Sequence, residues 1–493
     1  MIILYNPWST PSYKKPLPMS LLAVASMLEG EYDYEIVDAN LHAADGTDPV
    51  QHIIELGQRR KLTAIGFTVM PGPQLNHAVP DAQRLKAALP DVPIVWGGYF
   101  PSQHDDVVLK ENYVDFCIHS QGEQTFLELI RVLTKGGDFA SILGITYKAN
   151  GQIKHNPHRA LIPLDDLPDW PYHKLPMERY FHKHYLGQRV GTHHASYGCP
   201  FACNFCAVVG MVNKRWLPQS PERMARVLQL QKEQYGADAI QFHDMDFFVS
   251  EARTAEFAER IMPLGLTWWA LGRVDELMRY SDTTWQKMKA SGLKMVFSGA
   301  ESGSDEVLKR MNKGGKVTAS LTLELAKRMQ SFGVVPEFSF VLGNPPDPVA
   351  DIHTTIGFIR RVKEVNPAAE IIIYIYTPVP AEGTLYEEAK AMGFKFPDTL
   401  SEWVSGDWRS FSMRRDPHTP WLGPQTQKMV RDFERVLNAY YPTITDSKLT
   451  GLKRAVLRAL GGWRYHAQFY QHPLELRAFH RFFRYQRPET TGF

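Results

Sequence analysis

The 493 residues predict an α/β protein with a doubly wound parallel sheet, then a full or partial β/α barrel, then a mostly helical C-terminal region. Two observations carry this prediction: apolar runs of strand length alternate with helical patterns in two separate stretches, and the alternation stops near residue 394. Helix-length connections are what parallel strands require. With 44% hydrophobic and 22% charged residues, the chain is not disordered, collagen-like or a coiled coil as a whole.

The first stretch contains five strand-length apolar runs, at residues 2–5, 34–37, 64–69, 92–96 and 114–118. Helical patterns separate them, for example over 18–28, 50–56, 78–89 and 123–133. We therefore predict a first domain over 1–140, with its ligand beyond the carboxyl ends of the strands.

Prolines without any period indicate a linker over 141–190. Six further strands are expected within a second domain over 191–393, at 195–197, 239–243, 267–271, 295–298, 337–341 and 371–376. Six β/α units on this spacing predict a full or partial barrel. Residues 394–493 are expected to form helices and loops.

Four cysteines are too few for a disulfide framework. Cys117 lies in an apolar run and is expected to be a small buried side chain, whereas the other three lie close together. Clustered thiols indicate a reducing compartment, and the N-terminus does not resemble a signal peptide. We therefore expect a cytoplasmic protein without a membrane span. The net charge of +2 does not indicate a nucleic-acid partner.

The most informative segment contains Cys199, Cys203 and Cys206 on a short loop after a predicted strand. Three thiolates can hold three irons of a [4Fe–4S] cluster and leave the fourth iron open for substrate chemistry. The alternatives are a zinc site completed by His193 or His194, or three structural cysteines.

This CxxxCxxC pattern, with an aromatic residue before the last cysteine, resembles the radical SAM signature. The resemblance implies that the open iron binds S-adenosylmethionine and that one electron then produces a 5′-deoxyadenosyl radical. It also implies that Phe205 packs near the adenine.

Further motifs follow in the order that this superfamily has. The segment 241–248 resembles a polar SAM-contacting motif, 299–304 the GxESGS motif, 338–345 an FxxGxP element, and 377–384 a TPxPGT element with an Ala-Glu departure. The resemblance implies SAM contacts from His243, Asp244, Asp246, Arg273, Glu301, Ser302 and Ser339. From the residues alone, Asp244 and Asp246 could equally be helix caps, 299–303 a tight turn, and Arg273 part of an ordinary ion pair.

The first domain resembles the Rossmann-like (flavodoxin-like) cobalamin-binding domain that precedes the barrel in cobalamin-binding radical SAM proteins. The residues at the matching landmarks, and the cobalamin contacts thereby implied, are Asn6, Asp38, Gly97, Gly98, Gly122 and Glu123. One departure is the missing DxHxxG motif, since His42 does not have its spacing. The alternative is a doubly wound domain that binds no cobalamin.

The resemblance implies a cobalamin-dependent radical SAM methyltransferase that acts on an unactivated carbon of a small molecule, with a reductant such as flavodoxin or ferredoxin. The alternative within the family is a cyclisation or rearrangement without net methyl transfer, on a tetrapyrrole or another natural product. The alternative of another class is a sensor that binds the cluster or cobalamin without turnover.

The C-terminal tail is basic, with nine Lys or Arg against two acids over 447–493 and aromatic residues between them. We expect its aromatic residues, among them Trp463, Phe479, Phe482 and Phe483, to pack on the barrel. The alternatives are contact with an anionic membrane and contact with a nucleic acid.

Overall fold

The first sheet has seven strands in the order β2-β1-β3-β4-β5-β6-β7. The first five strands in this order pair in parallel, and β6 and β7 add an antiparallel hairpin at one edge. The strands are β1 (Ile2–Asn6), β2 (Tyr34–Asp38), β3 (Ala64–Thr68), β4 (Ile94–Gly97), β5 (Phe116–Ile118), β6 (Ile145–Ala149) and β7 (Gln152–His155). The predicted doubly wound sheet is confirmed.

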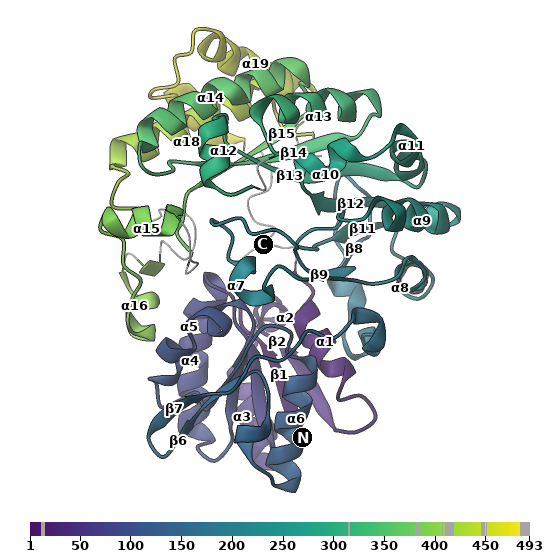
Figure 1. Ribbon diagram of the computed structural model, residues 1–493, viewed down its shortest axis with the longest axis vertical. Helices are drawn as coiled ribbons and strands as arrows, with labels where there is room; N and C mark the ends of the chain where they lie inside the picture. Colours follow the sequence, from purple (N-terminus) through teal and green to yellow (C-terminus); the bar gives the residue numbers. More distant parts are fainter. Residues whose placement is uncertain are drawn as a thin grey trace. The chain divides into compact units, whose positions relative to one another are not determined.

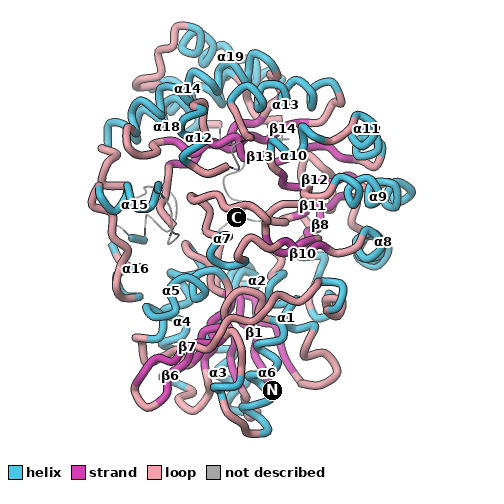
Figure 2. Tube along the Cα trace, viewed as in Figure 1, coloured by secondary structure: helices cyan, strands magenta, loops and turns pink. Residues whose placement is uncertain are grey.

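This computed structural model describes residues 1–10, 15–313, 316–379, 384–406, 408–409, 419–444, 449 and 451–483. The chain divides into two units. Figure 1 colours the chain by position in the sequence, and Figure 2 colours it by secondary structure. Unit 1 comprises Met1–Phe181, Gly210–Gln219 and Lys395–His418. Unit 2 comprises His182–Val209, Ser220–Phe394 and Thr419–Phe493.

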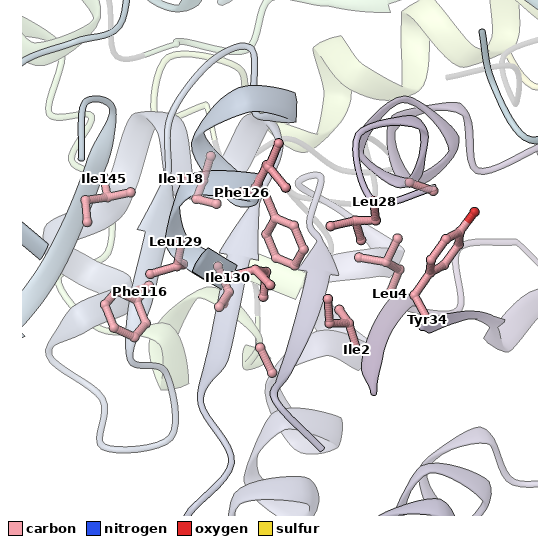
Figure 3. Close-up of a cluster of buried hydrophobic side chains, with 14 of the residues drawn as sticks. Ile2, Leu4, Leu28, Tyr34, Phe116, Ile118, Phe126, Leu129, Ile130 and Ile145 are labelled. Atoms are coloured by element: carbon pink, nitrogen blue, oxygen red, sulfur yellow. The ribbon is translucent and has the colours of Figure 1, made fainter. Parts of the chain in front are cut away.

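Helices α1 and α6 cover one face of the first sheet (Figure 3). Leu21 and Leu28 of the α1 region and Phe126 and Ile130 of α6 are buried against Ile2, Leu4 and Ile118. The α/β connections are α1 (Met19–Ser26), α2 (Ala39–Asp45), α3 (Pro49–Arg59), α4 (Pro73–Ala88), α5 (Tyr99–Leu109) and α6 (Glu123–Lys135).

The hairpin β6–β7 is absent from the sequence-based prediction, which placed a linker there. Its turn is Asn150-Gly151, and both residues have positive φ angles of 52° and 75°. Asn-Gly is the strongest short-range hairpin signal because a tight two-residue turn needs positive φ at both positions. The prolines that follow hid this signal.

The second sheet has six parallel strands in the order β15-β14-β13-β12-β11-β8. They are β8 (Val190–His193), β11 (Ala239–Phe242), β12 (Thr267–Gly272), β13 (Leu293–Glu301), β14 (Val335–Leu342) and β15 (Glu370–Ile375). The predicted partial barrel is confirmed, with one correction: its first strand is β8 and not 195–197. After His193 the chain leaves this sheet, and β9 (Ser196–Gly198) lies outside it.

Six helices of unit 2 begin where a side chain accepts a hydrogen bond from their first turn, which satisfies otherwise unpaired N–H groups. These N-caps are Ser220, Ser250, Ser281, Ser304, Thr318 and Asp347. The helices are, in the same order, α8 (Pro221–Tyr235), α9 (Glu251–Ile261), α11 (Asp282–Ala290), α12 (Asp305–Arg310), α13 (Ala319–Ser331) and α14 (Pro348–Val365). Other elements are α7 (Val208–Val212), β10 (Trp216–Pro218), α10 (Val274–Arg279), α15 (Thr384–Ala391) and α16 (Leu400–Trp403).

An outer layer of unit 2 consists of α18 (Pro424–Tyr440), α19 (Gly451–His466) and α20 (Leu474–Phe482), with α18 beside α14 (Figure 1). In this layer Leu457, Tyr465 and Leu476 are buried, but Trp463, Phe482 and Phe483 are exposed. The expectation that these three aromatic residues pack on the barrel is therefore wrong. The inward faces of these helices carry Leu457, Tyr465 and Leu476 instead.

Among the described residues, no helix is both long and apolar enough to cross a bilayer.

We predict that Gly461→Val loosens the outer layer. A Cβ at Gly461 would lie 2.8 Å from the Ala439 Cβ and 2.9 Å from the Tyr440 backbone nitrogen, so α19 would have to move away from α18. Overpacking of this kind costs about 1–3 kcal/mol and should lower the midpoint of thermal unfolding. Gly357→Ala in α14 is the control, because its Cβ would meet nothing within 4 Å. Equal midpoints for the two variants would contradict this account of the interface.

Candidate functional site

The loop with the three cysteines begins at a point held by Asp244. The Asp244 carboxylate accepts hydrogen bonds from the Ala195 backbone N–H at 2.7 Å and the Ser196 hydroxyl at 2.6 Å. Burial raises the pKa of Asp244 to about 6. Asp244 thus positions the entrance of the loop, and it is not a helix cap, since Ser250 caps α9.

The C-terminal turn of α12 holds the middle of the loop. The Asn204 amide donates to the Arg310 carbonyl at 2.6 Å, and the Asn204 backbone N–H donates to the Met311 carbonyl at 3.2 Å. In the other direction, the Asn312 side-chain amide donates a hydrogen bond to the Ala202 carbonyl at 2.8 Å. Sequence reasoning missed both asparagines, because their partners are backbone groups about a hundred residues away in the chain.

Arg273 connects the loop to the barrel. Its guanidinium donates to both oxygens of Asp275, to the Lys313 carbonyl at 2.6 Å and to the Cys203 Sγ at 3.3 Å, and it lies 3.7 Å from the centre of the Phe201 ring. Burial by itself lowers the pKa of Arg273, but Asp275 and Cys203 raise it by a larger amount, so the pKa lies above its ordinary value. The guanidinium therefore remains charged and places a positive charge against the Cys203 sulfur.

The three thiols influence one another electrostatically and are partly or fully shielded from water. Burial raises the pKa of Cys199 and raises that of Cys206 to about 11, and the neighbouring cysteines add to both shifts. Among the described residues, no group of three or more His, Cys, Asp or Glu side chains is arranged so that it could hold a metal ion. An iron–sulfur cluster is held by cysteine sulfur after metal binding has displaced the thiol protons, so three cysteines on one loop have the donor atoms that such a cluster requires.

A pair of buried carboxyl groups lies beside Cys199. The Asp246 Oδ2 is 3.9 Å from the Cys199 Sγ. Burial and the neighbouring Glu276 raise the pKa of Asp246, and burial also raises that of Glu276. Both carboxyl groups are therefore protonated more readily than exposed ones, which limits the negative charge beside Cys199.

The motif 299–304 forms a turn around Lys313, which is buried. The Lys313 ammonium donates to Glu301 Oε1 at 2.8 Å and to the Gly299 carbonyl. Glu301 has a φ of 64°, a strained value for a residue other than glycine. A Cβ at Gly299 would lie 1.9 Å from that Glu301 oxygen, so a side chain there would displace the Glu301–Lys313 pair. Sequence reasoning identified Glu301 but missed Lys313.

Ser302 has a structural role in the same turn. Its hydroxyl donates to Asp351 at 3.1 Å and accepts from the Ser304 backbone N–H. Asp351 also accepts from the backbone N–H groups of Gly343 and Asn344, and so joins the ends of β13 and β14.

The remaining predicted residues of unit 2 are spread along the sheet. Ser339 is buried in β14 opposite Gly299, and Phe205 is half-buried in the cysteine loop. His243 follows β11, where its ring centre lies 5.3 Å from that of Trp269. In the TPxPGT-like element, 380–383 lie outside the described residues.

In unit 1, Asn6 and Asp38 join the ends of β1 and β2 instead of pointing outward. The Asp38 carboxylate accepts from the Asn6 amide, the Asn40 backbone N–H and the Tyr180 hydroxyl, each at 2.9 Å. Gln74 donates to Asn6 at 2.7 Å. Both predicted residues are buried and thus shape the carboxyl edge of the sheet.

Glycines at the end of β4 bring two loops together at this edge. Gly98 has a φ of 99°, and a Cβ there would lie 3.1 Å from the Val69 carbonyl oxygen. Gly122 is the N-cap of α6, and burial raises the pKa of the following Glu123. The edge is built from close backbone turns, which suits a large ligand held by loops.

Two family models match the chain: the B12 binding domain over residues 12–130 and the radical SAM superfamily over residues 195–359. An uncharacterized methyltransferase of Pyrococcus horikoshii is 30% identical over 349 residues, which cover 70% of this chain and 73% of that protein. The chain belongs to the radical SAM enzymes that carry a B12-binding domain. Its cofactors are cobalamin, S-adenosylmethionine and a [4Fe–4S] cluster.

Two more distant similarities agree with this assignment, one in sequence and one in fold. An anaerobic magnesium-protoporphyrin IX monomethyl ester cyclase of Synechocystis sp. is 25% identical over 307 residues, 61% of this chain and 60% of the cyclase. The solved structure of the radical S-adenosylmethionine methyltransferase TsrM from Kitasatospora setae matches with a TM-score of 0.67 over 97% of this chain and 98% of that one. At 15% identity this second likeness shows the fold alone.

We predict that Lys313→Met destabilises unit 2 by about 3 kcal/mol, because it leaves the Glu301 carboxylate buried without its cation. Adding Glu301→Gln to Lys313→Met should restore part of the loss, since the two residues form one pair. Thermal unfolding of the single and double variants measures both effects. If the losses of the two single variants simply add, Lys313 and Glu301 do not act as a pair.

Proposed function

We propose that the protein is a cobalamin-dependent radical SAM methyltransferase that methylates an unactivated carbon of a small molecule. The observation that carries the proposal is the cysteine loop with one thiol fewer than the irons of its cluster, in a chain that also has a B12-binding domain. The 30% identical relative is named a methyltransferase, which supports methyl transfer.

We assign the cluster to Cys199, Cys203 and Cys206 and the SAM contacts to the carboxyl ends of the barrel strands. When bound, the cluster with SAM supplies the radical and cobalamin supplies the methyl group. The chain's own residues prepare the site: Asp244 and Asn204 fix the loop, and Arg273 places a positive charge against Cys203. Lys313 orients Glu301 at the strand end.

In unit 1, the turns that follow β3, β4 and β5 are assigned to cobalamin. Asn6 and Asp38 stabilise that edge of the sheet through their mutual hydrogen bond. Gly97 and Gly98 have no side chain, so a ligand could approach the backbone there. No residue takes the place of the DxHxxG histidine in the sequence, so we assign no protein ligand to cobalt.

A second candidate is cyclisation or rearrangement without net methyl transfer. The 25% identical porphyrin cyclase favours it, although the alignment spans only 60% of that enzyme. Either reaction needs an electron donor, and we propose an external reductant such as flavodoxin or ferredoxin.

The cysteine assignment predicts that Cys199→Ala, Cys203→Ala and Cys206→Ala each abolish SAM cleavage, since loss of one ligand removes the cluster. Anaerobically reconstituted variants are incubated with SAM and reductant, and 5′-deoxyadenosine is measured by mass spectrometry. Cys117→Ala is the matched control, because Cys117 is buried in β5 of the other unit and should leave cleavage intact. Native cleavage in any of the three loop variants would refute the assignment.

The methyltransferase proposal predicts that S-adenosylhomocysteine forms together with 5′-deoxyadenosine. The measurement uses methyl-deuterated SAM, reductant, cobalamin and a small-molecule extract, and it follows the label into a product. Label that reaches a product carbon supports methyl transfer. Repeated turnover to 5′-deoxyadenosine without S-adenosylhomocysteine, together with a substrate-derived product that carries no label, would instead establish the cyclase type of reaction.

A further inference from the structure

The segment 451–483, which contains the outer helices α19 and α20, holds most of the large exposed apolar side chains among the described residues. Of the twelve large hydrophobic residues exposed in the described part of the chain, seven lie within 451–483. Leu452 is 79% exposed, Trp463 53% and Phe482 77%. The other four are Val456, Phe469, Leu474 and Phe483. Single exposed apolar residues are ordinary, but such a concentration marks an interaction surface.

These side chains form stripes opposite the buried faces of their helices. At about 100° per residue, Leu452, Val456 and Trp463 of α19 lie within about 40° of one another. On α20, Leu474 and Phe482 lie within about 80° of each other, whereas Leu476 is turned away and buried. Each helix thus has an inward and an outward apolar face.

The two helices run antiparallel and lie on α18. Arg464 near the end of α19 pairs with Glu475 at the start of α20, while Lys453 at the start of α19 lies 5.3 Å over the ring of Phe483. Both helices contact α18, through the Tyr440–Tyr465 ring pair and the ion pair of Arg477 with Asp432. Their outward stripes therefore both face away from unit 2.

Positive charge predominates along this segment. Residues 451–483 contain six Lys or Arg and one acid, Glu475, which is paired with Arg464. Among the described residues, no carboxylate lies within ion-pair distance of Lys453 or Arg481. We refer to α19, α20 and these two cations as the basic apolar surface.

We propose that the basic apolar surface binds an anionic lipid bilayer, with Trp463, Phe482 and their neighbours inserted at the interface. Basic helices with Trp, Phe and Leu on one face lie in this way on membranes. A second copy of the chain is disfavoured, because two surfaces of the same positive charge repel each other. A protein partner would need matching pockets for seven separate side chains, whereas a bilayer accepts any arrangement of them.

The test is flotation of the full chain with vesicles of phosphatidylglycerol and phosphatidylcholine, compared with vesicles of phosphatidylcholine alone. We expect binding to the anionic vesicles, and its loss at about 1 M salt, where the Debye length falls to about 3 Å.

Lys453→Gln with Arg481→Gln should weaken binding about 25-fold, since each basic residue near the surface contributes about fivefold. Trp463→Ser with Phe482→Ser should weaken it at least about tenfold by removing inserted area.

Two control variants change the same residue types elsewhere. Met262→Ser with Val349→Ser replaces two exposed apolar residues outside the basic apolar surface, and Lys61→Gln with Lys327→Gln removes two exposed charges. Both controls should bind as the unaltered chain does. Absence of flotation, or losses in the controls that equal those in the test variants, would overturn the proposal.

Two further results would replace the bilayer by another partner. A dimer in sedimentation velocity that Trp463→Ser with Phe482→Ser dissolves, without vesicle binding, would assign the surface to a second copy. Binding of labelled RNA that survives this double substitution and displaces the vesicles would assign it to nucleic acid.

Discussion

The buried guanidinium of Arg273 is the contact on which the rest of the site depends. A buried cation is costly unless its donors are satisfied, and here a carboxylate, a backbone carbonyl and a cysteine sulfur satisfy them. These three partners come from the start of α10, the turn after α12 and the cysteine loop. One planar, permanently charged group therefore fixes three segments that are far apart in the sequence.

The turn after α12 extends this arrangement to the strand ends. Asn312 and the carbonyls of Arg310 and Met311 hold the cysteine loop, and Lys313 holds Glu301 from the other side. Since Arg273 also binds the Lys313 carbonyl, the cluster loop and the expected SAM-binding turn share a single support. A change in this turn should disturb both cofactor sites together.

Several residues that motif patterns assign to cofactor binding use their side chains on the protein itself. Asp244, Ser302, Asn6 and Asp38 all bond to backbone groups or to neighbouring side chains within their own unit. Their role is to position loops, and the loops then present backbone and glycine surfaces. In the outer helices α19 and α20, by contrast, several apolar side chains are exposed to solvent among positively charged residues.

The sequence by itself determined the two α/β regions, and it singled out the three clustered cysteines and the carboxyl ends of the strands, to which we assign the site. These features depend on local periodicity and close spacing, which a single chain displays directly. Asn204 escaped because its partners lie about a hundred residues away in the chain, and Lys313 and Asp351 escaped because they stand outside the motif segments that they support. The β6–β7 hairpin escaped because prolines followed its turn signal. Only the tertiary structure decided which aromatic residues of the tail are buried: helices α19 and α20 must bury Leu457, Tyr465 and Leu476 against α18 and its neighbours, and that packing turns Trp463 and Phe482 toward solvent.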